Sequence, residues 1–343
     1  MKNFVLKTFV VTAVIFLGFS LNSYSQTAEE YYNRAYEKDK LQDYRGAVAD
    51  YSKAIELNPV YSNAYFRRGA AKYELQDYIG AIADFTKVIE LDLKNSDAYS
   101  NRGVAKNELE DYIGAIADYS KAIELNPIDS IAYLNRGNAK HNLQDYIGAI
   151  ADYSKAIEID PKNIYAYNMR GINKGKLQDY RGAIADYSKA IDLNPMYSDA
   201  YHWRGKNKAQ LKDYSGATAD YSKAIEIDPK NSKIYKSRGA VKILLQDYIG
   251  AIADFNKCIE LVPNDEQAYN IRGNIKTQSE DYYGAIADYS RAIEIDPKNS
   301  NNYYSRGMVK ILLNQKESGC LDLSKAGELG DNNAYEMIKK YCN

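Results

Sequence analysis

The sequence repeats itself every 34 residues. The dipeptide Asp-Tyr recurs at this spacing from Asp43-Tyr44 to Asp281-Tyr282, with no insertion or deletion between copies. A fixed period of about 20 to 50 residues is typical of a solenoid, in which each unit packs mainly against its neighbours. The period therefore sets the domain organisation, although a chain of 343 residues could hold two ordinary domains by length alone.

Each unit predicts a helical hairpin. In its second half, apolar residues fall at i, i+1, i+4, i+7 and i+8, as in Ala115, Ile116, Tyr119, Ala122 and Ile123. This spacing is one stripe of an amphipathic helix. The first half also has a helical face, formed by Tyr65, Gly69, Lys72 and Leu75. Asp77 lies between the two halves and is the predicted N-cap of the second helix.

The prolines mark where one hairpin ends and the next begins. All of them follow the second helix of a unit, at Pro59, Pro127, Pro161, Pro195, Pro229, Pro263 and Pro297. Proline cannot continue a helix interior, because it lacks the backbone donor and its ring clashes with the preceding turn. One unit is therefore helix, tight turn, helix and proline turn.

These positions carry a family resemblance. The chain from about Ala28 to Asp331 resembles the tetratricopeptide repeat family, with family residues at Tyr65, Gly69, Tyr78, Ala81, Phe85 and Pro127. The resemblance implies an all-α, right-handed superhelical solenoid, with first helices lining a concave groove and second helices outside. It predicts repeats at 28–61, 62–95, 96–129, 130–163, 164–197, 198–231, 232–265 and 266–299, a divergent ninth at 300–331 and a capping helix at 332–343.

Three charged positions never change between units. We name each position by its residue in the second unit; every unit has arginine at the Arg68 position, where the family usually has leucine. The Lys72 and Asp84 positions are equally uniform. Arg68 and Asp84 lie at similar distances from the turn on facing helices, so we expect one ion pair per repeat. A periodic charged surface for a partner is the alternative. Close helix approach would explain the recurring glycine at the Gly80 position.

The first 25 residues differ from the rest and predict a secretory signal peptide over 1–25. Lys2 and Lys7 give a positive start, an apolar run covers 9–19, and the small residues Ser23 and Ser25 precede the expected cleavage. The apolar run is shorter than the ~20 residues that span a bilayer. We expect a periplasmic or secreted protein with no membrane insertion after cleavage; an uncleaved anchor is the alternative.

The first helix also has positions that differ in almost every unit. They are the Phe66, Ala70 and Tyr73 positions, which are spaced three or four residues apart and so share one helical face. In the family this face lines the groove, and its variation indicates either a surface shaped for a partner or drift. Repeats four to six provide the predicted partner-binding groove: Asn135, Asn138, His141, Tyr165, Asn168, His202, Trp203 and Lys206.

The composition and the motifs argue against nucleic-acid binding and against an enzymatic activity. The charges nearly cancel, with 45 Lys+Arg against 46 Asp+Glu, so nothing indicates nucleic-acid binding. Two histidines, three cysteines and no nucleotide or metal motif predict no catalytic residue, no cofactor and no metal.

Cys320 and Cys342 are equally far from a turn near Asp331, which predicts a disulfide outside the cytoplasm, whereas Cys258 is expected to be a buried thiol.

The sequence thus predicts an exported scaffold that binds a protein or peptide through its groove and is not an enzyme. Two alternatives remain open. A structural protein could assemble end to end as a homo-oligomer through the apolar residues Ile243, Leu244, Ile311 and Leu312. A carrier could instead bind a glycan or another small ligand at Trp203.

Overall fold

The computed structural model describes residues 26–342, so the predicted secretory segment 1–25 lies outside the described residues. The described part of the chain is all-α, with consecutive helix-turn-helix pairs and no strand, which confirms the predicted fold class. No helix among these residues combines the length and the apolar character needed to cross a membrane. The chain divides into two compact units, with the boundary between Asp145 and Tyr146.

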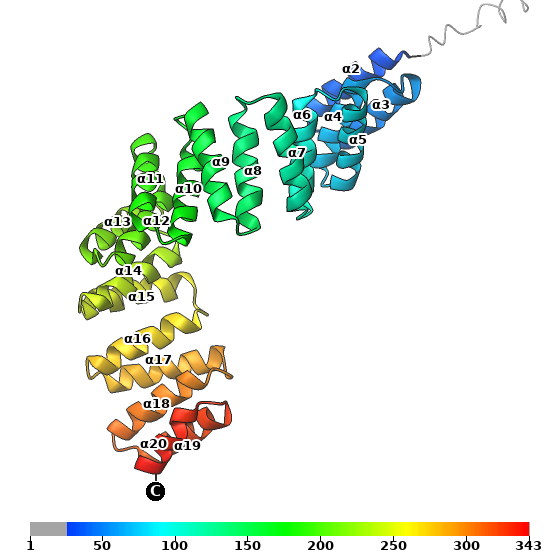
Figure 1. Cartoon of the computed structure of the whole chain (residues 1–343). Helices are drawn as coiled ribbons and strands as arrows, with labels where there is room; N and C mark the ends of the chain where they lie inside the picture. The colour runs from blue at the N-terminus through cyan, green and yellow to red at the C-terminus, as the bar shows by residue number, and fades with distance from the viewer. Residues whose placement is uncertain (1–25, 343) are drawn as a thin grey trace, which may run out of the picture. The chain divides into compact units, whose positions relative to one another are not determined.

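The first unit is a stack of helices in which each helix packs on the next (Figure 1). First helices also contact the first helix of the following hairpin. The helices are α2 (Ala28–Lys40), α3 (Tyr44–Leu57), α4 (Ser62–Glu74), α5 (Tyr78–Leu91), α6 (Ser96–Glu108), α7 (Tyr112–Leu125) and α8 (Ser130–Asn142).

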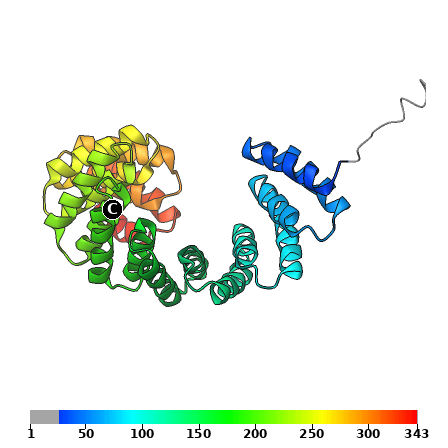
Figure 2. The same cartoon turned by 90° about the horizontal axis from the view of Figure 1, so that it is seen from above.

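The second unit continues the same hairpin pattern, and its helices follow a curved path when seen from above (Figure 2). It contains α9 (Tyr146–Ile159), α10 (Ile164–Lys176), α11 (Tyr180–Leu193), α12 (Ser198–Gln210), α13 (Tyr214–Ile227), α14 (Ser232–Leu244), α15 (Tyr248–Leu261), α16 (Glu266–Gln278), α17 (Tyr282–Ile295), α18 (Ser300–Leu312), α19 (Lys316–Glu328) and α20 (Asn332–Tyr341).

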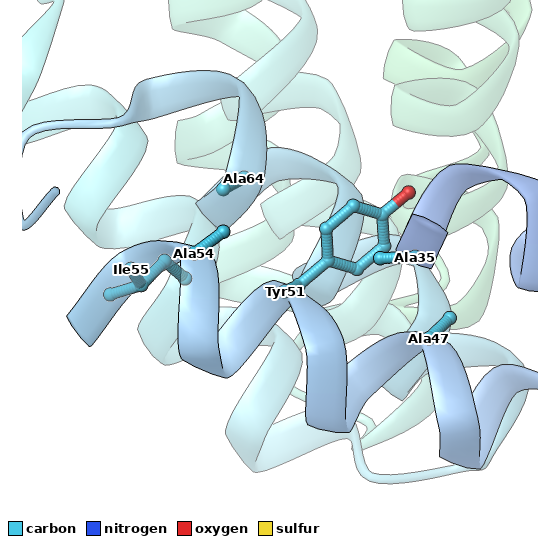
Figure 3. Close-up of a cluster of buried hydrophobic side chains, with 6 residues drawn as sticks. All are labelled: Ala35, Ala47, Tyr51, Ala54, Ile55 and Ala64. Carbon is cyan, nitrogen blue, oxygen red and sulfur yellow. The ribbon is translucent and has the colours of Figure 1, made fainter. Parts of the chain in front are cut away.

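The core between hairpins is built from small residues around one large side chain per unit, which is an aromatic ring except in the last unit, where it is Leu323. In the first hairpin, Tyr51 of α3 is fully buried and lies among alanines of α2, α3 and α4 (Figure 3). The alanines Ala35, Ala47 and Ala64 are also fully buried and leave room for the ring. Because buried residues recur at the same positions in each described hairpin, the 34-residue period is a period of core contacts.

The turn inside the hairpins depends on one left-handed residue and, in hairpins before the last, on one aspartate cap; Gln315 replaces the aspartate in the last hairpin and makes no side-chain cap. Gln76 has φ of 62°, and its counterparts in the other described hairpins also have positive φ. Asp77 follows and caps α5, since its carboxylate accepts a hydrogen bond from the Gly80 backbone N–H at 3.0 Å. The predicted N-cap is therefore confirmed, and it satisfies a donor that the start of the helix leaves free.

The capping aspartate also explains the glycine at the Gly80 position. A Cβ added to Gly80 would overlap the Asp77 carboxylate rather than a neighbouring helix. The expectation of close helix approach is therefore wrong for Gly80. It applies instead at Gly69, where an added Cβ would lie 3.1 Å from the Phe85 ring.

This arrangement predicts that substitutions at the cap and at the glycine are coupled. We expect Asp213→Ala to cost about 1 kcal/mol of unfolding free energy through loss of the α13 cap. Gly216→Ala is expected to destabilise the wild type, because the new Cβ displaces the Asp213 carboxylate. In the Asp213→Ala background it should stabilise by up to ~1 kcal/mol, through helix propensity. Urea unfolding of the four proteins, followed by Trp203 fluorescence, tests this; equal effects in both backgrounds would contradict it.

The predicted arginine–aspartate pairs are present and include a third partner. Asp84 accepts from Arg68 Nη2 at 2.6 Å and from Lys72 Nζ at 2.8 Å, and it is almost fully buried. We call this arginine–aspartate–lysine set the ionic triad. The described arginine–aspartate pairs are Arg34–Asp50, Arg68–Asp84, Arg102–Asp118, Arg170–Asp186, Arg204–Asp220, Arg238–Asp254, Arg272–Asp288 and Arg306–Asp322.

Each ionic triad also connects neighbouring hairpins. Arg68 Nη1 donates to Ser52 Oγ of the preceding unit at 3.0 Å, and its counterparts make the same kind of contact. The aspartates are buried and the arginines are directed between helices, so the triads hold hairpins together. This burial argues against the alternative of a periodic charged surface for a partner.

A short final helix covers the last hairpin. α20 packs on α19, and Met337 and Ile338 lie against the buried residues Leu323 and Ala326. Cys320 and Cys342 are joined by a disulfide whose Cα atoms are 5.8 Å apart. Cys258 is a fully buried free thiol, as predicted. The end of the stack is therefore closed by apolar contacts and by a covalent bond.

Candidate functional site

The exposed face of the first helices is rotated from the face that the sequence predicts. Residues at the position of Asn63 and at that of Glu74 are exposed in every described unit. By contrast, the Phe66 and Tyr73 positions are half-buried or buried throughout, because consecutive first helices pack against each other there. Of the three variable positions, only that of Ala70 contains exposed residues, at Lys206, Ala240 and Asn274. The predicted groove face therefore needs this correction.

A pocket of about 220 Å³ opens on this exposed face in the second unit. It lies where α10, α11 and α12 meet. Its lining consists of Ile172, Gly175, Lys176, Tyr180, Tyr187, Trp203, Lys206, Asn207 and Gln210.

Trp203 and Lys206 form one wall of the pocket. Both project from α12, and Lys206 Nζ lies 4.9 Å from the centroid of the Trp203 ring, a cation–π distance. Asn207 fixes the base of this wall, since its buried Nδ2 donates to the Trp203 carbonyl oxygen at 2.8 Å. Lys176, at the end of α10, adds a second exposed ammonium group to the lining.

Repeat five contributes one small residue and one apolar residue of the first helix to the lining. Gly175 is the single glycine at the Tyr73 position, and Ile172 occupies the Ala70 position. Between them lies Tyr187 of α11, which is fully buried. Its phenol oxygen has no hydrogen-bond partner in the described part of the chain. Burial, together with the charge of Asp186, raises the Tyr187 pKa, so the phenol stays protonated.

Two predicted site residues are not part of the pocket lining, although the His202 ring lies 5.6 Å from the Trp203 ring. His202 Nε2 lies 3.2 Å from Ser237 Oγ of α14, and the imidazole ring packs 5.8 Å from the Tyr221 ring. Burial, followed by the charge of Lys206, lowers the pKa of His202, which favours the neutral ring. Asn168 is buried on α10, and its Oδ1 lacks a hydrogen-bond partner among the described residues. Both occupy the Phe66 position, which faces the neighbouring helix.

The other predicted site residues lie on two units. Tyr165 is exposed on α10 at the Asn63 position, on the same exposed face as the pocket but outside its lining. Asn135, Asn138 and His141 are half-buried residues of α8, in the first unit. The structure therefore brings together Trp203 and Lys206 of the predicted set.

Sequence reasoning missed most of the lining. Gly175 could have been found from the sequence, because the other units have larger side chains at its position. Lys176 and Gln210 lie at the Glu74 position. The comparison of units by their Phe66, Ala70 and Tyr73 positions does not include it. Nothing in the sequence singles out Tyr187, because nearly every unit has an aromatic residue at its position.

A second hollow of about 270 Å³ lies on the exposed face of the first unit. Its lining combines one arginine and one aspartate with aromatic and amide groups: Tyr32, Asn63, Phe66, Arg67, Asn95 and Asp97. Because its charges are of both signs, it shows no preference for one ligand charge.

The chemistry of the Trp203 pocket is suited to binding. Its lining contains no histidine, cysteine, aspartate or glutamate, so the usual acid–base and nucleophile pairs are missing there. Within residues 26–342, no group of three or more metal-binding side chains comes together. An aromatic wall, two ammonium groups and a buried phenol can hold a ligand by stacking, charge and hydrogen bonds.

The fold is a solenoid of helical hairpins with a pocket on the exposed face of its first helices. Family models described as tetratricopeptide repeat match residues 96–129, 130–163, 62–95 and 198–231, and a model described as TPR repeat matches 40–76, 176–211 and 273–310. Together these matches cover more than half of the sequence. The chain belongs to the tetratricopeptide repeat family. No curated protein matches it.

Solved structures share the fold. The C-terminal part of a TPR repeat-containing protein from Cytophaga hutchinsonii has a TM-score of 0.62 and 20% identity, covering 70% of this chain and 98% of that one. A tetratricopeptide repeat protein from Parabacteroides merdae has a TM-score of 0.53 and 23% identity, covering 72% and 99%. The Cut9–Hcn1 hetero-tetramer of APC/C gives 0.50 and 16%, covering 99% and 82%.

Proposed function

We propose that this protein is an exported, non-catalytic scaffold that binds a protein or peptide on the exposed face of its first helices. Membership of the tetratricopeptide repeat family supports a general role in protein or peptide interaction. One observation carries the finer proposal, namely the pocket around Trp203 on that face. A buried aromatic anchor beside cationic and amide groups is the composition of a binding hot spot.

The exposed face gives an extended ligand room on both sides of this anchor. Tyr165 lies on α10 at the same face, 45% exposed, and Gln210 extends the lining toward the end of α12. Large exposed aromatic residues contribute contact area at a low cost in conformational entropy. A peptide that crosses several first helices could therefore anchor one side chain in the pocket and contact Tyr165 with another.

Because Trp203 is the only tryptophan, its fluorescence reports on this site alone. Peptides selected on the purified protein from a random nine-residue library are expected to change the Trp203 emission on binding. Trp203→Ala, measured by calorimetry, should weaken binding by at least about tenfold, the usual effect of removing a hot spot. Tyr283→Ala is the matched control, since Tyr283 is an exposed aromatic residue on a second helix. If selected peptides bind Trp203→Ala as tightly as wild type, the pocket is not the anchor.

Self-assembly is a second candidate because two of the four apolar residues predicted for an end-to-end contact are exposed. Leu244 and Leu312 are 59% and 58% exposed, whereas their neighbours Ile243 and Ile311 pack against core clusters. Sedimentation of wild type and of a Leu244→Gln, Leu312→Gln variant separates the two functions. A mass that rises with concentration only in wild type would favour assembly. Sugars that change Trp203 emission would favour the glycan carrier.

The exported location is supported by the sequence of residues 1–25. We expect the mature protein in the periplasm or outside the cell, with Gln26 as its first residue. Mass spectrometry of the N-terminal peptide from fractionated cells tests this, and an intact N-terminus held in the membrane fraction would contradict it.

A further inference from the structure

The charged side chains that line the Trp203 pocket are both lysines, so the lining is positively charged and rich in hydrogen-bond donors. Lys176 and Lys206 are exposed lysines of the lining, and neither forms an ion pair within residues 26–342. By contrast, the lysines of the ionic triads pair with carboxylates, as Lys208 does with Asp220. The pocket therefore holds two cations whose charge no nearby carboxylate of the described chain neutralises.

The buried hydroxyl of Tyr187 is a third hydrogen-bond donor. The equivalent tyrosine of repeat eight shows which acceptors are missing around it. Tyr289 is its counterpart in repeat eight, where the hydroxyl donates to Asn274 Oδ1 at 2.8 Å and lies 3.2 Å from Thr277 Oγ1. The residues equivalent to Asn274 and Thr277 in repeat five are Ile172 and Gly175, whose side chains cannot accept. A buried hydroxyl without a partner is unfavourable because its lost hydration is not replaced, so an incoming acceptor would be stabilised there.

Resting on the proposed function, we infer that this pocket binds the carboxylate side chain of an acidic residue, aspartate or glutamate, in a partner peptide. The carboxylate accepts from the two ammonium groups and from the Tyr187 hydroxyl, and it supplies the charge that the lining lacks. The methylene groups of the same residue lie against Trp203 and Ile172. A volume of about 220 Å³ accommodates one such side chain, so the pocket selects a residue rather than a folded surface.

The test uses peptides that differ in one group. Sequences obtained in the library selection are synthesised with their acidic residue, and again with the amide isostere, both with an amidated C-terminus. A third version has the amide side chain and a free C-terminal carboxylate. Titration of purified wild-type protein is followed by Trp203 fluorescence at low and at high salt.

The acidic version is expected to bind about threefold to tenfold more tightly than its amide twin, the range for two partly exposed ion pairs. Added salt should reduce the difference. Lys176→Gln with Lys206→Gln should remove it, whereas Lys230→Gln with Lys298→Gln, a charge-matched change at exposed turn lysines, should leave it intact. Ile172→Asn, which copies the acceptor of repeat eight, should also weaken the preference while the protein stays folded.

The outcomes separate this inference from the proposed function. Equal binding of acidic and amide twins, with a Trp203 response to both, overturns the carboxylate inference and leaves the peptide site. A gain shown only by the free C-terminal version also overturns it, in favour of a chain terminus as the source of the carboxylate. No binding by any selected peptide overturns the proposed function and the inference together.

Discussion

Replacement of Asp220 by asparagine is expected to lower the free energy of unfolding by about 2–4 kcal/mol. The Asp220 carboxylate is almost fully buried and accepts from Arg204 Nη2 at 2.7 Å and from Lys208 Nζ at 2.8 Å. Asparagine keeps the shape but removes the negative charge, which leaves two cations close together with little water around them. Losing one partner of a buried ion pair is costly because the other partners remain desolvated.

A neighbouring ion pair provides the control for this prediction. Glu226 pairs with Lys223 on the same helix, α13, but both side chains are about half exposed or more. Glu226→Gln should therefore change stability by less than about 0.5 kcal/mol. Urea unfolding, followed by Trp203 fluorescence in the same repeat and by circular dichroism, measures both variants. A similar small loss in the two proteins would show that the ionic triads contribute no more than surface pairs.

Loss of the Cys320–Cys342 disulfide is expected to destabilise the end of the stack by about 3 kcal/mol. The bond closes a loop with a sequence separation of 22 and ties the last residue of the cap to α19. Without it, α20 retains only its apolar contacts with Leu323 and Ala326. Cys320→Ser with Cys342→Ser should increase hydrogen exchange in α20 and α19, while α10 to α13 keep their protection, because a solenoid transmits stability mainly to adjacent repeats.

Cys258 supplies the control for removal of a cysteine. It is fully buried at a position that alanine occupies in several other units, including Ala224 and Ala292. Cys258→Ala should therefore cost less than about 1 kcal/mol and leave the exchange of α20 unchanged. If the double serine variant exchanges like wild type, or if the exported protein has both thiols free, the disulfide does not hold the cap.

Much of the fold was predictable because its causes are local and repeated. Apolar spacing, the capping aspartate and the proline turn act within one unit, and each recurs with the same 34-residue step. The pairing of Arg68 with Asp84 also followed, since both residues lie at similar distances from one tight turn. Its lysine partner did not, because Lys72 lies one helical turn beyond Arg68 and could equally have faced solvent.

The candidate site was predictable only in part. Variation between units pointed to the first helices, and the single tryptophan lies in one of the two repeats that form the pocket. His202, next to Trp203 in the chain, was expected to share its side of the helix. Adjacent residues in a helix point about 100° apart, so His202 packs against α14 while Trp203 lines the pocket.

By itself the sequence determined the hairpin, its length, its turn and the contacts that every unit repeats, because these depend on residues close together in one hairpin. The tertiary structure decided which side of each first helix is exposed, since that depends on how neighbouring first helices pack. It also decided that Gly175, Tyr187 and Trp203, from three different helices, surround one pocket. Among residues 26–342, the hydroxyl of Tyr187 has no hydrogen-bond partner because of the side chains that surround it in the folded hairpin, which depends on tertiary packing.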